Sequence, residues 1–255
     1  MTLAARFAAG ETIFTAWSSL PEPLTTEALC ATAFDAITLD MQHGGHSDDS
    51  VLRGLAPVIG AGKPSLVRIP VGRNDMASRA LDFGADAVIA PMINSADDAR
   101  AFASAMKFPP LGERSWGAAF ALARRGGDGP TLLAEGNRQT VALAMIETRR
   151  AFDALDDILA VPGIDGVFVG PSDLSIAWTD GKKIAPTLED MMGAVEHIAA
   201  QTRKAGKHAG IYLVDVSIAG RFAAMGYQLF AIGAEARLMA EGAKSLIGQA
   251  KATIG

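Results

Sequence analysis

Short apolar runs rich in β-branched residues recur along the whole chain, and a longer stretch with helical spacing follows each of them. This alternation is typical of repeated strand–helix units, in which a buried strand is covered by the helix that follows it. We predict eight strands, at residues 13–17, 36–40, 65–69, 86–90, 141–146, 165–169, 208–213 and 228–232.

Polar residues and glycines mark the predicted ends of the helices. Ser47, Ser95 and Thr187 each stand one or two positions before acidic residues, which is the pattern of an N-cap followed by an acidic first turn. Glycine stands just before five of the predicted strands, where a helix has to stop, at positions 62, 84, 163, 206 and 226.

The number of strands decides between two α/β architectures. Eight parallel strands in 255 residues fit a closed (β/α)8 barrel, or TIM barrel, and no G-x-G-x-x-G motif favours an open dinucleotide-binding sheet. We therefore predict an α/β fold in which residues 1–255 form one barrel domain.

The longest stretch without a regular pattern runs from Phe108 to about Pro130 and includes the pair Arg124 and Arg125. A loop of this length in a compact domain usually has a function. We expect it to leave the fourth strand on the catalytic side of the barrel and to serve as a lid or an oligomer contact.

Charge and cysteine content narrow the possible partners. The formal net charge is -5, and lysines and arginines are scattered among acids, so we predict no nucleic-acid partner. Cys30 is the only cysteine and lies in an apolar run, which predicts a buried thiol and no disulfide. The N-terminus lacks the apolar core of a signal peptide, and charged residues interrupt every apolar stretch long enough to span a bilayer. We expect a soluble, cytoplasmic protein that does not bind membranes.

In a TIM barrel the active site lies at the carboxyl ends of the strands, so polar residues there are the candidates for chemistry. The predicted strand ends carry few of them, namely Trp17, Asp40, Gln42, His43, Arg68, Glu147, Ser172 and Asp173. Glu147 and Asp173 follow adjacent strands and should lie together. Two carboxylates without cysteines or clustered histidines suit a hard divalent cation better than structural zinc. The alternative is that Glu147 pairs with an arginine and Asp173 caps a helix; position favours the metal site.

His43 and Arg68 complete the candidate site. Imidazole can accept a proton at neutral pH, and a guanidinium can stabilise a developing enolate or pair with Asp40 or Glu147. His46, in the same loop, is expected to support this site or the start of the next helix. No lysine lies at the carboxyl end of a strand and no phosphate-binding G-x-x-x-x-G-K-[ST] loop is present, which disfavours imine chemistry and nucleotide hydrolysis.

Several segments together carry a family resemblance. They are Asp40-x-x-His43, Val67-Arg68, Leu81-Asp82-x-Gly84, Ala90-Pro91-Met92, Pro109-Pro110-x-Gly112-Glu113-Arg114, Ile146-Glu147-Thr148 and residues 163–175. With them the chain resembles, over nearly its whole length, the HpcH/HpaI-type class II pyruvate aldolases, which cleave 4-hydroxy-2-oxoheptanedioate or 2-dehydro-3-deoxyglucarate on a phosphoenolpyruvate/pyruvate-binding barrel.

The resemblance implies a role for each candidate. Glu147 and Asp173 would hold Mg²⁺, Mn²⁺ or Co²⁺, which chelates pyruvate, and Arg68 would stabilise the pyruvate enolate. His43 would move the proton of the aldehyde-derived hydroxyl, and Asp82 would raise the basicity of His43.

The resemblance also implies a binding surface and an assembly. Gly170, Pro171 and Ser172 would bind the substrate carboxylate, and Trp17 and Leu213 would border the aldehyde. Asp82 ends a helix at the opposite face of the barrel from His43. We therefore hypothesise that it reaches the His43 of a neighbouring subunit in a homohexamer, a trimer of dimers with exchanged C-terminal helices.

Substrate preference stays open, because the chain departs from the best-known members of this family. Gln42 replaces a glutamate, Met145 a glutamine and Ser172 an alanine, and a thioether cannot replace an amide as a hydrogen-bonding group. Two other functions stay open. One is an acyl-CoA lyase of the citramalyl-CoA or malyl-CoA type, with Arg124 and Arg125 lining a basic groove, and the other is a non-catalytic barrel that binds a small oxo acid.

Overall fold

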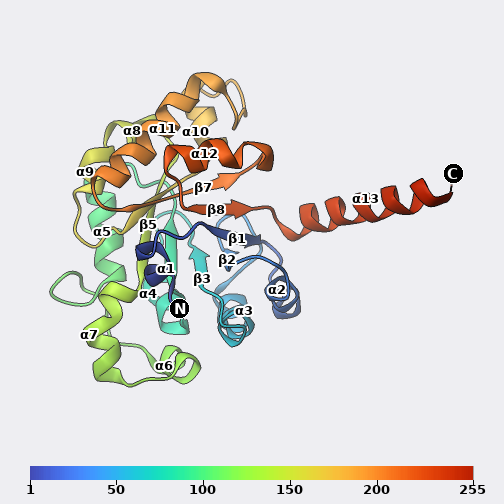
Figure 1. Ribbon diagram of the computed structural model, residues 1–255. Helices are drawn as coiled ribbons and strands as arrows, with labels where there is room; N and C mark the ends of the chain where they lie inside the picture. The colour runs from blue at the N-terminus through green and yellow to red at the C-terminus, as the bar shows by residue number, and fades with distance from the viewer. Residues whose placement is uncertain (255) are drawn as a thin grey trace.

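Eight buried strands close into one parallel barrel in the computed structural model, which describes residues 1–254 (Figure 1). Each strand pairs with its neighbour in sequence, and the first pairs with the last. The strands are β1 Ile13–Ser18, β2 Ala36–Asp40, β3 Ser65–Arg68, β4 Ala87–Ala90, β5 Val141–Ile146, β6 Gly166–Val169, β7 His208–Leu213 and β8 Leu229–Ile232. The eight predicted strands and the TIM barrel are confirmed.

Helices alternate with the strands and cover the outside of the barrel (Figure 1). They are α1 Leu3–Ala8, α2 Pro23–Cys30, α3 Asp48–Gly60, α4 Asn74–Phe83, α5 Ala96–Met106, α6 Ala119–Arg125, α7 Gly129–Gln139, α8 Arg149–Asp153, α9 Leu155–Leu159, α10 Pro171–Trp178, α11 Glu189–Lys204, α12 Ala219–Met225 and α13 Glu235–Ile254, with a short 3-10 helix at Val216–Ile218.

The caps test the predicted helix starts. The Ser47 and Ser95 hydroxyls accept backbone N–H groups at the starts of α3 and α5, as predicted. The prediction for Thr187 is wrong: Leu188 is the N-cap residue of α11 and makes no side-chain cap. Glu189 and Asp190 occupy the first turn, where acidic side chains favour the helix dipole without a capping hydroxyl.

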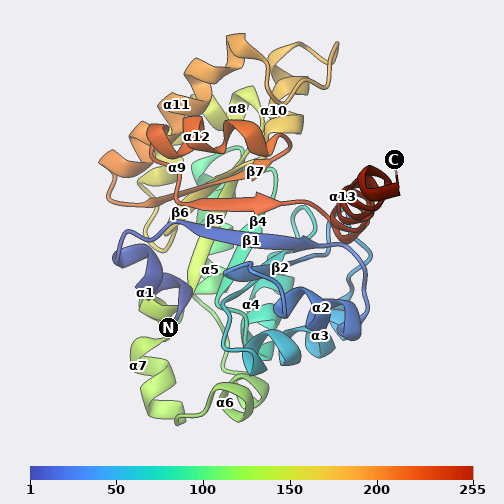
Figure 2. The same cartoon turned by 45° about the vertical axis from the view of Figure 1, so that its right-hand side comes forward.

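The buried side chains form two layers. One fills the barrel interior, where Leu3 and Phe7 of α1 pack with Leu143, Phe168 and Leu229 from the strands. The other lies between the strands and the surrounding helices. Figure 2 shows α1 at the end of the barrel where β1 begins and α13 at the end where β1 finishes. Because α1 closes the amino-terminal end, the cavity of the barrel opens toward the carboxyl ends of the strands.

The prediction of a lid on the catalytic side of the barrel is wrong. β4 leads directly into α5, and the stretch from Phe108 to Pro130 follows α5, so it returns to the amino-terminal ends of the strands and contains α6. Arg125 of α6 donates to the carbonyl of Gly84 at 2.8 Å and to Asp86, just before β4, at 2.7 Å. The stretch therefore cannot cover the carboxyl ends; its role as an oligomer contact stays a prediction.

The last helix, α13, leaves the barrel and projects into solvent (Figures 1 and 2). Within residues 235–254 only Glu235 is buried. Met239, Leu246 and Ile247 are 61%, 69% and 55% exposed. Such a row of apolar side chains on an isolated helix indicates a surface that another element covers. No helix within residues 1–254 combines the length and apolar character that membrane crossing requires.

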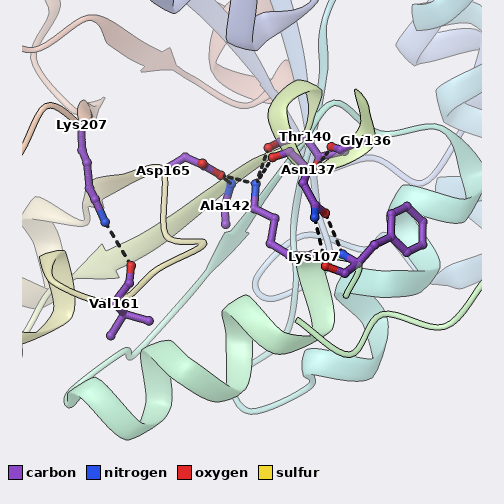
Figure 3. A network of polar contacts seen from close by, with 9 residues as sticks. Lys107, Gly136, Asn137, Thr140, Ala142, Val161, Asp165 and Lys207 are labelled. Atoms are coloured by element: carbon purple, nitrogen blue, oxygen red, sulfur yellow. Dashed lines mark hydrogen bonds and ion pairs between the residues drawn. The ribbon is translucent and has the colours of Figure 1, made fainter. Parts of the chain in front are cut away.

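A buried lysine fastens the amino-terminal face of the barrel (Figure 3). The side chain of Lys107 is fully buried, and its Nζ donates to the carbonyls of Asn137 and Thr140 at 2.9 and 2.7 Å and to Asp165 at 2.7 Å. Asp165 also accepts the Ala142 N–H at 2.7 Å. One ammonium thereby joins α5, α7 and the starts of β5 and β6.

Replacing Lys107 by methionine should therefore destabilise the fold. The change removes the lysine donor from two carbonyls and from the Asp165 carboxylate. We expect the free energy of unfolding to fall by about 3 kcal/mol. Urea unfolding measures it, with Lys182→Met, at an exposed lysine, as the control. Equal stabilities of the two variants would contradict this role.

Candidate active site

A buried ion pair joins the carboxyl ends of β2 and β3. Asp40 and Arg68 are register partners and the last residues of their strands. Arg68 donates from Nε to Asp40 Oδ1 at 2.8 Å and from Nη2 to Oδ2 at 2.7 Å. Trp17, at the end of β1, donates from its indole N–H to Asp40 Oδ2 at 3.2 Å, and its ring lies 4.8 Å from the Arg68 guanidinium carbon. Of the two partners that the sequence left open for Arg68, Asp40 and Glu147, the structure shows Asp40.

The Asp40 carboxylate also holds the loop that carries His43. Its Oδ1 accepts the backbone N–H groups of Gln42 at 3.0 Å and His43 at 3.3 Å. Burial by itself would raise the pKa of Asp40, but the hydrogen bonds and charge of Arg68 and the N–H donors outweigh it and lower the pKa below its ordinary value. Asp40 is therefore a fixed anion, and it holds the backbone that carries the exposed His43 side chain.

Glu147 and Asp173 follow β5 and β6, three strands further round the barrel than β2 and β3. Glu147 follows β5, is 2% exposed, and accepts the Met92 N–H at 2.7 Å on Oε1. Met92 has a left-handed φ of 55°, a conformation that is costly for a non-glycine residue and that aims its N–H at the carboxylate. Asp173 lies in the first turn of α10 and is exposed.

The turn between the two carboxylates is closely packed by side-chain ends. A Cβ on Gly170 would lie 2.6 Å from Glu147 Oε2 and 2.9 Å from Met145 Cε, so a larger residue here would require these two side-chain ends to move. Glu147 Oε2 therefore stands directly beside the start of α10. The alternative pairing of Glu147 with an arginine is not what forms, because Arg68 hydrogen-bonds Asp40.

The two carboxylates repel each other. Burial raises the pKa of Glu147 to about 7, and the charge of Asp173 adds to this effect, while the Met92 N–H and the charge of Arg68 oppose it. Within residues 1–254 no three His, Cys, Asp or Glu side chains converge on one point, so a cation here would have two protein carboxylates and take its other ligands from water or substrate. This oxygen donor set fits a hard divalent cation.

A cavity of about 270 Å³ opens at these strand ends. Its lining consists of Trp17, Ser19, Asp40, His43, Arg68, Met145, Phe168, Gly170, Pro171, Ser172, Asp173, Tyr212 and Ala234. Six predicted site residues are thus brought together with Arg68 at one opening. Trp17, Phe168 and Tyr212 form an aromatic wall. The ring centroid of Phe168 lies 5.7 Å from that of Trp17, and the ring centroid of Tyr212 lies 5.4 Å from it.

Glu147 is buried and is not among the lining residues, and two other predicted residues lie elsewhere. Leu213 is fully buried in the layer between strands and helices, and Tyr212 lines the cavity in its place, because successive side chains of a strand face opposite sides. Asp82, near the end of α4, accepts a hydrogen bond from Arg114 at 2.8 Å. It lies next to Gly84 and α6 at the amino-terminal face, the opposite face from His43 of the same chain. Burial raises the pKa of Asp82, although Arg114 opposes it.

A parallel barrel whose strand ends gather carboxylates, an arginine and a histidine around a small cavity has the architecture of a barrel enzyme. The chain belongs to the HpcH/HpaI aldolase/citrate lyase family, whose model matches residues 14–242. The resemblance inferred from the sequence is therefore confirmed, and the protein is a carbon–carbon lyase.

Individual relatives agree with this assignment. The chain is 34% identical to a hydroxypyruvate/pyruvate aldolase of Roseovarius nubinhibens, over 97% of this chain and 96% of that protein. It is 35% identical to a 4-hydroxy-2-oxo-heptane-1,7-dioate aldolase of Salmonella dublin, over 90% and 87% of the two chains. The solved structure of an HpcH/HpaI aldolase from Desulfitobacterium hafniense superposes with a TM-score of 0.88 at 25% identity and covers 97% of this chain and 96% of its own.

The raised pKa of Glu147 predicts a pH-dependent stability. Because its pKa is higher in the folded than in the unfolded protein, its contribution is complete below about pH 4.5 and is lost as the pH rises to about 7. Glu147→Gln removes the charge and should raise the free energy of unfolding at pH 8 by about 2 kcal/mol, with little effect at pH 4.5. Unfolding curves in the presence of a chelator measure it. If Glu147→Gln changed the free energy of unfolding by the same amount at pH 8 and at pH 4.5, the raised pKa of Glu147 would be contradicted.

Proposed function

We propose that the protein is a divalent-metal-dependent aldolase that reversibly cleaves 4-hydroxy-2-oxo acids to pyruvate and an aldehyde. The observation that carries this proposal is a cavity of about 270 Å³ lined by Arg68 and Asp173, with the buried Glu147 near enough for the charges of both to act on its pKa. The cavity has the size for a small acid, and its aromatic wall suits the carbon chain of an aldehyde. The name of the Roseovarius relative, a hydroxypyruvate/pyruvate aldolase, supports pyruvate as one of the reacting molecules.

Glu147 and Asp173 would hold the cation, and Mg²⁺, Mn²⁺ and Co²⁺ all fit oxygen ligands. Bound there, it would act as a Lewis acid toward the 2-oxo group of the substrate. Arg68 faces the same space and would stabilise negative charge on the substrate oxygen. Asp40 fixes the guanidinium in position through both hydrogen bonds, so Arg68 needs no reorganisation as that charge develops.

The start of α10 would bind the substrate carboxylate. Ser172 and Asp173 present backbone N–H groups in the first turn of this helix, next to Gly170, which has no side chain to obstruct an approaching anion. His43, at the rim of the cavity, would take the proton of the substrate hydroxyl as the carbon–carbon bond breaks and return it in the reverse reaction.

An acyl-CoA lyase remains the second candidate function, but the two arginines that were predicted to line its CoA groove lie elsewhere. Arg124 donates to the carbonyls of Phe83 at 2.8 Å and Leu52 at 2.6 Å, and Arg125 binds Gly84 and Asp86. Both arginines therefore serve the amino-terminal face of the barrel and do not line a CoA groove at the cavity.

A coupled assay of pyruvate release distinguishes the two candidates. We expect cleavage of 4-hydroxy-2-oxo acids with Mn²⁺, none with chelator, and no cleavage of citramalyl-CoA. Arg68→Lys keeps the charge but loses the two-pronged hydrogen bond and should lower kcat/KM by about 100-fold or more. Arg138→Ala, at an exposed arginine, is the control. Activity that survives the chelator, or a preference for the thioester, would refute the proposal.

We also propose a homohexamer, a trimer of dimers, in which Asp82 of one subunit supports His43 of another. Asp82 and the rim lie at opposite faces of one chain, so only a neighbouring chain brings them together. The exposed apolar row on α13 supports an exchanged helix, since docking on a second copy would bury it.

Mixed oligomers test this sharing of residues. His43→Ala and Asp82→Ala should each be nearly inactive alone. Co-expressed in equal amounts with different tags, they should regain about a quarter of the wild-type activity, because about one site in four then combines an intact His43 with an intact Asp82. No recovery in purified mixed oligomers would mean either that both residues act within one subunit or that Asp82 has no part in the reaction.

A further inference from the structure

A buried polar network lies at the base of α13 and borders the cavity at Ser19. Glu235, the first residue of the helix, is only 3% exposed. Its carboxylate accepts the Ser18 hydroxyl at 2.6 Å and the backbone N–H groups of Ser19 at 2.9 Å and Leu20 at 3.4 Å. All three donors come from the carboxyl end of β1 and its loop, so Glu235 ties the projecting helix to the strand that carries Trp17.

The network continues into the loop that carries His43. The imidazole of His46, itself 6% exposed, lies between Ser18 Oγ, 3.0 Å from Nε2, and Ser50 Oγ, 3.2 Å from Nδ1. The Ser18 hydroxyl has one proton and donates it to Glu235, so Ser18 Oγ must accept the proton on Nε2 of His46. Burial lowers the pKa of His46, although the charges of Glu235 and Asp40 oppose it.

Two backbone contacts press the same loop against the end of β1. The Gly45 N–H donates to the Ser19 carbonyl at 2.8 Å. A Cβ on Gly44 would lie 2.4 Å from the Asp40 carbonyl and 3.0 Å from Ser19 Cα. The turn that carries His43 is therefore held at both sides, by Asp40 before it and by the Ser18–His46–Glu235 network after it.

We propose that Glu235 is a positioning residue that acts through Ser18, Ser19 and His46 to hold the loop of His43 in its working position at the cavity. This inference rests on the proposed function, because it assigns the proton transfer to His43. Glu235 thereby makes that step depend on the base of α13, the helix that we expect to dock on another subunit.

The proposal predicts a separation of two activities. The network contacts β1 and the β2 loop, whereas Glu147 and Asp173 follow β5 and β6. Loss of Glu235 should therefore impair carbon–carbon cleavage, which needs His43, and spare the exchange of pyruvate methyl protons, which needs the carboxylates and Arg68. A carboxylate that only stabilises the fold would affect both activities alike.

The experiment compares Glu235→Ala and the milder Glu235→Gln with Glu241→Ala, at an exposed glutamate of the same helix. We expect Glu235→Ala to lower kcat of cleavage by about tenfold or more. Proton exchange with Mn²⁺ should stay within about twofold of the wild type. Glu235→Gln keeps one acceptor oxygen and should show a smaller loss of the same kind. Parallel loss of both activities, or unchanged cleavage, would overturn the proposal.

A second readout needs no activity and so stands apart from the proposed function. The chain has four histidines, and their imidazole signals can be followed by NMR. Glu235→Ala should shift or broaden the signals of His43 and His46 and leave those of His197 and His208 unchanged. An unchanged His43 signal would refute the positioning role, whereas a wild-type protein without either activity would refute only the aldolase assignment.

Discussion

The arrangement at the open end of the barrel depends on the pairing of Asp40 with Arg68. Burying two opposite charges is costly unless each finds several partners, and here one carboxylate meets both prongs of the guanidinium, the indole N–H of Trp17 and two backbone N–H groups. The pair spans β2 and β3, orients the arginine toward the cavity, and fixes the start of the loop that carries His43. One ion pair therefore sets the positions of three side chains on three different segments.

Two buried acids in this barrel have opposite properties because their neighbours differ. The pKa of Asp40 is lowered by a guanidinium and N–H donors, whereas the pKa of Glu147 is raised by burial and by Asp173. The charge of Asp40 is already balanced by Arg68, so Asp40 supports the structure. The charge of Glu147 is not balanced beside Asp173, and a bound cation would stabilise both carboxylates. This contrast separates the supporting acid from the pair that we propose as metal ligands.

The sequence predicted the local features well and the long-range ones poorly. Apolar runs located all eight strands, and the rule that chemistry lies at the carboxyl ends of barrel strands brought out Trp17, His43, Arg68 and Asp173, which line the cavity. Strand alternation, applied to β7 from the barrel interior outward, would have selected Tyr212 in place of Leu213. The bond between Ser18 and Glu235 joins residues 217 positions apart, and no local pattern reports such a contact. We propose that Asp82 acts on a second chain, and one sequence cannot place a residue relative to another chain.

The most direct test of the central claim is the exchange of pyruvate methyl protons with deuterated water, followed by NMR with the wild-type protein. We expect exchange with Mn²⁺, no exchange after treatment with a chelator, and recovery of exchange when Mn²⁺ is restored. This outcome would establish that the protein forms a pyruvate enolate and needs a cation to do so. Absence of exchange with any divalent cation would contradict the account and favour the thioester-cleaving lyase.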